Sequence, residues 1–118
     1  MMPVIIEFPT HHDERGNLTV AENLPFVLKR AFWLHGIHGD RGRHAHRLCE
    51  QVIVAVAGEA QVFTEQEGKN RMYRLSDPRL GLYVPPGNCV TVKAQPQAAV
   101  LVLCSTSYDA EDAVPCAS

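Results

Sequence analysis

A chain of 118 residues is long enough to bury a hydrophobic core in one domain without disulfides or a structural metal. It is 46% hydrophobic and 20% charged with a net charge of -2, and it has no cluster of Lys and Arg of the kind that binds nucleic acid. No apolar run of about 18 residues could span a membrane, and the first residues lack the basic and apolar regions of a signal peptide. We therefore expect no nucleic-acid partner, no membrane partner and a cytoplasmic location.

Short apolar segments rich in Val, Ile, Leu and aromatic residues follow one another along the chain. They are Val4–Phe8, Leu18–Ala21, Val27–Leu34, Gln51–Ala57, Ala60–Thr64, Arg71–Leu75, Gly81–Val84, Cys89–Ala94 and Ala98–Cys104. Turn-forming sequences separate most of them, and no window of helical length shows an apolar period with capping residues. This pattern predicts a single all-β domain over residues 1–118, a sandwich or a barrel, with a flexible C-terminal tail at about residues 109–118.

The segment Val52–Val56 is apolar at every position, whereas a strand with one face in water alternates apolar and polar residues. Such a strand is covered on both faces. One face would line the interior of a small barrel, and a second copy of the chain is the simplest cover for the other face. We therefore expect a homodimer.

The cysteines lie far apart in the sequence and form no CxxC motif; they are Cys49, Cys89, Cys104 and Cys116. They lie in or beside apolar segments. We interpret them as reduced, mostly buried thiols of a cytoplasmic protein rather than as a disulfide framework.

The densest group of chemically active residues is Arg41-Gly42-Arg43-His44-Ala45-His46. Residues two apart in a strand point to the same side, so His44 and His46 are expected to project together into the interior of a barrel. Two imidazoles in such a place form either part of a metal site or an acid–base pair, because histidine titrates near neutral pH. We interpret His11 and His12, in contrast, as ordinary surface residues.

The spacing around these histidines resembles the motifs of cupins, which are jelly-roll β-barrels. In the first cupin motif, His-x-His precedes a glutamate and a glycine, and here Gln51 and Gly58 occupy those two positions. In the second motif a histidine follows Pro-x-Gly, and at that position this chain has Val90. Two of the four metal ligands would remain, whereas catalytic zinc sites use three protein ligands. We therefore predict a cupin without metal, in which the two histidines work as acid and base.

The whole chain, from residue 4 to 112, resembles the WxcM-like cupins, a family of nucleotide-sugar 3,4-ketoisomerases that act on dTDP-4-keto-6-deoxyglucose. The matching residues are Asp13-x-Arg15-Gly16-x-Leu18, Pro25-Phe26, Lys29-Arg30, Arg41-Gly42-x-His44-Ala45-His46, Gln51, Gly58, Gly81-Leu82-Tyr83-Val84-Pro85-Pro86, Ser105, Tyr108 and Asp112. The chain departs from the family at Cys89, where a tryptophan is usual, at Val90, where a polar residue is usual, and at His35, where tyrosine is common. The first two lie near the expected sugar pocket and leave the identity of the sugar open.

The resemblance implies a reaction in which the ketone of a dTDP-linked deoxysugar moves from C4 to C3 through an enediol, with no cofactor. His44 and His46 are the implied catalytic residues, one acting on carbon and the other on protons at the oxygens. The implied substrate-binding residues are Arg30, Arg41, Gln51, Arg15 and Tyr83. Among these, Arg30 is a candidate for stabilising the enediolate and Arg41 for meeting the diphosphate.

Other classes of function stay open. A metal-dependent cupin, such as a dioxygenase, would bind Fe, Ni or Zn at His44 and His46 together with Glu50. A non-catalytic cupin would bind a nucleotide sugar without turnover, which the replacements at Cys89 and Val90 would fit. A sugar 3,5-epimerase fits the motifs less well, and those chains are longer.

Overall fold

The described residues, 1–116, form strands joined by turns and loops in the computed structural model. The strands are β1 Val4–Glu7, β2 Thr10–Asp13, β3 Gly16–Thr19, β4 Arg30–Leu34, β5 Arg41–His46, β6 Gln51–Ala57, β7 Ala60–Gln66, β8 Lys69–Leu75, β9 Leu80–Val84, β10 Cys89–Ala94, β11 Ala99–Cys104 and β12 Ala113–Pro115. Within this part of the chain there is no helix long and apolar enough to cross a membrane. The prediction of an all-β domain is confirmed.

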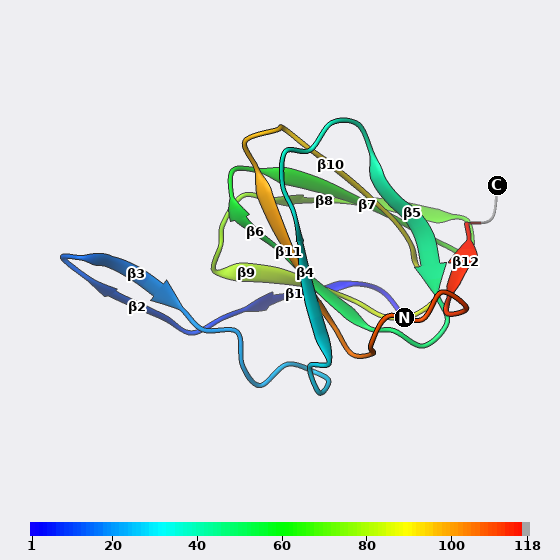
Figure 1. Ribbon diagram of the computed structural model, residues 1–118, viewed down its shortest axis with the longest axis horizontal. Coiled ribbons are helices and arrows are strands. Elements are labelled where there is room, and N and C mark those ends of the chain that lie inside the picture. The colour runs from blue at the N-terminus through cyan, green and yellow to red at the C-terminus, as the bar shows by residue number, and fades with distance from the viewer. Residues whose placement is uncertain (117–118) are drawn as a thin grey trace.

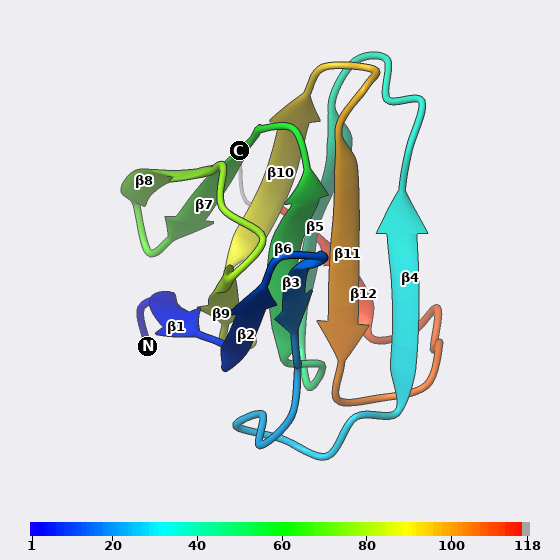
Figure 2. The same cartoon turned by 90° about the vertical axis from the view of Figure 1, so that its left-hand side faces the viewer.

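Two five-stranded antiparallel sheets face each other, and a separate hairpin projects from them (Figure 1). The first sheet has the order β1-β9-β6-β11-β4, and the second has the order β12-β5-β10-β7-β8. Figure 2 shows β6, β11 and β4 side by side, with β5 and β10 behind them. Strands that are distant in sequence are therefore neighbours in each sheet, as in a jelly roll.

The space between the sheets is filled by apolar side chains from their facing surfaces. Ile53, Leu82, Val62 and Val100 are at most 1% exposed there. Ile53 and Leu82 pair across β6 and β9, so both side chains lie on the same face of the first sheet. Alternation along the strands thus directs one set of residues into the core and leaves the other set outside.

The outer face of the first sheet carries a second apolar cluster. Its buried members are Phe8, Val52, Val54 and Leu103, and the partly buried side chains packed on them include Leu24 and Phe26. Strand β6 is therefore apolar on both faces in part because N-terminal residues of the same chain cover the outer face. Trp33 and Val56 lie beyond this cover on the same face and are 63% and 45% exposed.

The sequence pattern misses two of the strands. Strand β2 has the sequence Thr-His-His-Asp, and its side chains need no apolar character because the β2–β3 hairpin lies outside both sheets. Strand β12 falls in the segment expected to be a flexible tail, where Ala113 pairs with His46 and Pro115 with His44. Residues 117 and 118 of that predicted tail lie outside the described residues.

The interpretation of all four cysteines as reduced thiols is wrong for two of them. Cys89 and Cys116 form a disulfide, with their Cα atoms 5.5 Å apart. Cys49 and Cys104 are free and buried, as expected. The two bonded residues are 27 positions apart in the sequence, and they meet because β10 and β12 both pair with β5.

Candidate active site

A cavity of about 540 Å³ lies between the two sheets beside β5. Its lining residues come from five strands and two loops: Arg30, Phe32, Leu34, Asp40, Arg41, Gly42, His44, His46, Gln51, Ile53, Val90, Val92, Val102 and Tyr108. Five of the residues predicted from the sequence are thus brought together, namely His44, His46, Arg30, Arg41 and Gln51. An apolar wall with a few converging polar groups is the usual composition of a small-molecule site.

A β-bulge in β5 turns Arg41 toward the same side as the histidines. His44 pairs with Val90, and the register then shifts by one residue at Arg43. Gly42 and Arg43 both have positive φ angles, 98° and 66°. A Cβ atom at residue 42 would lie 2.7 Å from the carbonyl oxygen of Val90, so this approach requires glycine. Strict alternation would place residue 41 on the face opposite to the two histidines, and the extra residue reverses that.

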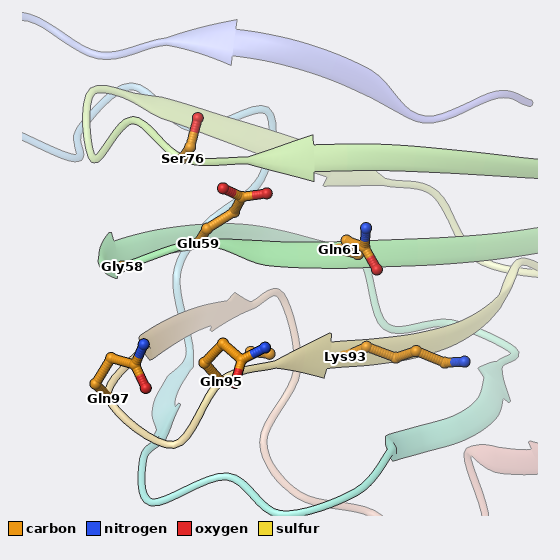
Figure 3. A pocket seen from close by; sticks show the side chains of 8 residues that line it. Gly58, Glu59, Gln61, Ser76, Lys93, Gln95 and Gln97 are labelled. Atoms are coloured by element: carbon orange, nitrogen blue, oxygen red, sulfur yellow. The ribbon is translucent and has the colours of Figure 1, made fainter.

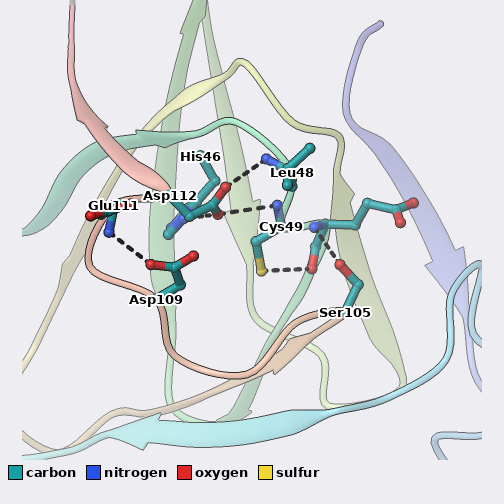
Figure 4. Close-up of polar contacts among 8 residues, drawn as sticks. His46, Leu48, Cys49, Ser105, Asp109, Glu111 and Asp112 are labelled. Atoms are coloured by element: carbon teal, nitrogen blue, oxygen red, sulfur yellow. Dashed lines mark hydrogen bonds and ion pairs between the residues drawn. The ribbon is translucent and has the colours of Figure 1, made fainter.

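A buried carboxylate supports His46 from behind (Figure 4). Nδ1 of His46 lies 3.1 Å from Oδ2 of Asp112, and the side chain of Asp112 is only 7% exposed. Asp112 also accepts hydrogen bonds from the backbone N–H groups of Leu48, at 2.8 Å, and Cys49, at 3.2 Å. With an acceptor facing Nδ1, that nitrogen carries the proton, and Nε2 of His46 is left free to accept one.

Asp112 is ionised despite its burial. Burial alone would raise the pKa of this carboxyl group, but the hydrogen bonds from Leu48, Cys49 and His46 outweigh that effect and hold its pKa below the ordinary value. A carboxylate that accepts three hydrogen bonds holds the ring of His46 in one orientation and one tautomer.

Two aromatic rings hold the side chain of Arg30 at the cavity. Its guanidinium carbon lies 4.9 Å from the ring centroid of Phe32 and 5.4 Å from that of Tyr108. Guanidinium groups stack favourably on aromatic faces, which restricts their motion. Arg30 is therefore held in position to meet an anionic or oxygen-rich group in the cavity, and Tyr108 presents an exposed ring beside it.

Tyr83 and Arg15, the other two predicted substrate-binding residues, do not line this cavity. The hydroxyl group of Tyr83 donates a 2.6 Å hydrogen bond to Glu50, and burial together with this bond raises the pKa of Tyr83 to about 12. Its ring packs in the outer cluster of the first sheet. Arg15 lies on the exposed hairpin and bonds Asp13 at 2.6 Å. Glu50, which accepts the bond from Tyr83, does not line the cavity either.

Two residues of the site had no role assigned from the sequence, although the family pattern contains both. Asp112 and Tyr108 belong, with Ser105, to the terminal set that resembles the WxcM-like cupins. Ser105 exchanges two hydrogen bonds with Glu50. Its Oγ accepts from the N–H at 2.8 Å (Figure 4). Its own N–H donates to the carbonyl at 3.0 Å. This attachment fixes the start of the loop that carries the other two residues. This family pattern was the sequence feature that could have identified Tyr108 and Asp112, but it does not indicate which strand they approach.

A second hollow, of about 700 Å³, lies beside the turns at the far end of β6 (Figure 3). Exposed amide side chains dominate its lining, together with Glu59 and Lys93. It contains no histidine and no buried charged group, so it offers no group suited to proton transfer. Within residues 1–116, no three His, Cys, Asp or Glu side chains lie close enough to hold a metal ion.

Comparison with known families agrees with this geometry. Residues 1–115 match the family described as FdtA, WxcM-like, C-terminal. The chain belongs to this family. The match spans both sheets, the hairpin and the strand β12, so the cavity and Asp112 all lie within the matched region.

Relatives of this WxcM-like protein include sugar isomerases. A TDP-4-oxo-6-deoxy-alpha-D-glucose-3,4-oxoisomerase of Aneurinibacillus thermoaerophilus is 32% identical over 114 residues, which cover 92% of this chain and 82% of the relative. The crystal structure of QdtA, a sugar 3,4-ketoisomerase of Thermoanaerobacterium thermosaccharolyticum in complex with TDP, has a TM-score of 0.91 at 26% identity, over 95% of this chain and 86% of that one. A 3,4-ketoisomerase of Helicobacter canadensis has a TM-score of 0.92 at 28% identity, over 97% and 90% of the two chains.

Proposed function

We propose that this protein is a nucleotide-sugar 3,4-ketoisomerase that moves the keto group of a dTDP-4-keto-6-deoxyhexose from C4 to C3. The observation that carries the proposal is the placement of His44 and His46 on the cavity side of β5, with Asp112 behind His46. The related 3,4-oxoisomerase and the ketoisomerase crystallised with TDP support the choice of reaction and of ligand.

His46 is the base that acts on carbon. The carbonyl at C4 acidifies the hydrogen at C3, and Nε2 of His46 removes it while Asp112 holds the ring from the other side. The electron pair of the C3–H bond forms the C3–C4 double bond of an enediolate, and the C4 oxygen takes up the negative charge. Return of a proton to C4 then leaves the ketone at C3.

The remaining cavity residues exchange protons with the sugar oxygens or bind the sugar and the diphosphate. His44 lies on the same face as His46 and exchanges protons with the O3 and O4 oxygens as the double bond forms and disappears. Arg30 and the buried side chain of Gln51 donate hydrogen bonds to the enediolate or to sugar hydroxyl groups. Arg41, turned to this side by the bulge, meets the diphosphate.

The deciding experiment is incubation with dTDP-4-keto-6-deoxyglucose, followed by NMR of the product. We expect a 3-keto sugar and, in D₂O, at least partial deuterium at C4, because a histidine base exchanges its proton with solvent. Binding of the substrate without turnover would replace this proposal with that of a non-catalytic nucleotide-sugar-binding protein. Activity that needs stoichiometric Fe, Ni or Zn would replace it with a metal-dependent enzyme.

We further propose that the protein is a cytoplasmic homodimer. Trp33 and Val56 extend the apolar outer face of the first sheet beyond the part that the chain itself covers. A stable interface there would bury on the order of 1,600 Å². Arg15 lies on a hairpin that projects away from its own barrel, so it would reach a substrate only in the cavity of a second copy (Figure 1).

Sedimentation tests this assembly. A dimer at micromolar concentration that dissociates when Trp33→Glu introduces a charge would support it, and a monomer at all concentrations would overturn it. Cell fractionation tests the location.

A further inference from the structure

The disulfide between Cys89 and Cys116 ties together the two strands that flank the histidine strand. Strand β5 lies between β12 and β10, and His44 pairs with Pro115 on one side and with Val90 on the other. Cys89 directly precedes Val90, and Cys116 directly follows Pro115. The covalent bond therefore crosses β5 at the level of His44.

Without this bond, β12 has few attachments. It is three residues long, it lies at the edge of its sheet, and it ends in a proline, which has no N–H group to donate to the ladder. The residues of β12 that pair with β5 are Ala113, Val114 and Pro115. The segment before it is held by Asp112, whose carbonyl oxygen accepts the N–H of Arg47 at 3.1 Å and whose carboxylate meets Leu48, Cys49 and His46.

The same segment that the disulfide anchors thus carries the carboxylate behind His46. Three residues separate Asp112 from Cys116, so the tie restricts how far the carboxylate can move from the ring. A single covalent bond to β10 is the strongest link between this end of the chain and the barrel.

The disulfide is also within reach of a reductant. Both cysteines are half-buried and line shallow surface hollows, one of which also contains Arg43, Arg71 and Lys93 together with Asp40 and Glu65. A cationic side chain beside a cysteine favours the thiolate, the form that takes part in thiol–disulfide exchange. Cys49 and Cys104, in contrast, are buried in the core.

We propose that Cys89 and Cys116 form a thiol–disulfide switch that controls how firmly Asp112 is held against His46. In the oxidised state the disulfide fixes β12 to β10, and Asp112 stays in contact with the ring. In the reduced state β12 detaches more readily and the contact is lost for part of the time. The consequence for catalysis rests on the proposed function, whereas the change in the contact itself does not.

The exchange partner is a small thiol such as glutathione or a protein dithiol. Its thiolate attacks one sulfur, which breaks the Cys89–Cys116 bond and forms a mixed disulfide, and a second thiol then releases the reductant as its own disulfide. Two electrons pass to the two cysteine sulfurs, which take up two protons. Oxidation by the disulfide form of the same partner runs in reverse.

The test compares oxidised and reduced protein by two measurements that do not depend on activity. After equilibration with oxidised glutathione, mass spectrometry of alkylated, digested protein should show Cys89 linked to Cys116, with Cys49 and Cys104 carrying the alkyl group. Amide exchange followed by NMR should then show the N–H groups of Leu48 and Cys49 exchanging about 10-fold faster after reduction, because local opening exposes them more often.

The control is Cys116→Ser, in which these amides should exchange at the fast rate with or without reductant, while core amides such as that of Ile53 stay unchanged. Absence of the linked peptide at every glutathione ratio would overturn the proposal, and so would equal exchange of Leu48 and Cys49 in the two states. If the exchange changes as expected but the protein isomerises no sugar, the switch stands and the proposed function fails. In active enzyme, reduction should lower kcat in the wild type and have no further effect in Cys116→Ser.

Discussion

The chain has two pairs of histidines close together in sequence, and the structure places them in opposite surroundings. His44 and His46 are two apart on β5 and face a cavity, and a buried carboxylate contacts the second of them. His11 and His12 are adjacent on β2, so they point to opposite sides of an exposed hairpin, where Nδ1 of His12 lies 2.6 Å from Oδ1 of Asn17. The residue type is the same, but only the first pair shares an enclosed space with other polar groups.

This difference shows what makes a histidine pair suitable for catalysis. The hairpin pair is exposed to solvent, which screens any charge nearby, and no carboxylate bonds either ring among the described residues. At the cavity, the core holds β5 in place and the Asp112 carboxylate fixes one ring. The comparison between barrel and hairpin can be tested residue by residue, because several residues of the site have a counterpart on the hairpin.

The largest expected effect is on turnover. His44→Asn and His46→Asn should each lower kcat on the order of 10²–10⁴-fold, the usual contribution of general acid–base catalysis. The thermal midpoint should change little, because both side chains reach the cavity rather than the packed core. The double variant should be little worse than either single one.

The matched control is His12→Asn, whose kcat should stay within a few-fold of the wild-type value. Steady-state kinetics on the keto sugar provide the measurement. Near-normal turnover of both cavity variants, or an equal loss in the hairpin variant, would break the contrast between the two pairs.

The next effect concerns the carboxylate behind the ring. Asp112→Asn should lower kcat by about 10- to 100-fold, typical of residues that orient a functional side chain, with little change in KM. The ¹⁵N shifts of the His46 ring should show a mixture of tautomers in place of one. Asn17→Ala, which removes the partner of His12, should leave kcat unchanged. A purely structural role for Asp112 would lower the thermal midpoint without changing the tautomer.

Two glycines allow a comparison of backbone effects. Gly42 and Gly16 both have positive φ, but an added Cβ meets the Val90 carbonyl at 2.7 Å in the first case and nothing within 4 Å in the second. Gly42→Ala should therefore lower the free energy of unfolding by about 1–3 kcal/mol and lower activity as Arg41 moves. Gly16→Ala should lower the free energy of unfolding by less and leave the cavity unchanged. Urea unfolding measures the free energy of unfolding. Equal losses in the two variants would show that the close approach of residue 42 to the Val90 carbonyl is unimportant.

The smallest expected effect is the acid dependence of stability. Hydrogen bonds hold the pKa of Asp112 below its ordinary value, so the folded state binds fewer protons than the unfolded chain. The stability that Asp112 contributes is therefore complete above the unfolded pKa, at about pH 4, and is lost as the pH falls through the lower folded value. The difference in unfolding free energy between wild type and Asp112→Asn should be constant near neutral pH and shrink in acid.

On the hairpin, the hydrogen bonds from Arg15 lower the pKa of Asp13 as well, but both groups are in water, so Asp13→Asn should change stability little at any pH. Urea unfolding of the wild type, Asp112→Asn and Asp13→Asn at pH values from neutral to acid measures these differences in stability. A constant difference for Asp112→Asn down to the most acid pH would show that the carboxylate is not linked to folding.

The fold and much of the site could be predicted from the sequence because they depend on local patterns. Alternation of apolar and polar residues in segments such as Ala60–Thr64 and Cys89–Ala94 indicates which side of each strand enters the core. The two-residue spacing of His44 and His46 likewise determines that they share a face. These are consequences of strand geometry, and any sheet built from these segments would preserve them.

Only the tertiary structure decided the rest, because it depends on contacts between distant segments or on breaks in the regular pattern. Arg41 faces the cavity because of the bulge at Arg43. Strict alternation along the strand would place this side chain on the opposite face. Asp112 contacts His46 across 66 residues, and Cys116 bonds Cys89, because β12 pairs with β5. At three residues, β12 is too short for a sequence pattern to predict it. A strand of three residues forms only where a sheet edge presents unpaired backbone groups to it, and that edge exists only once the barrel has folded.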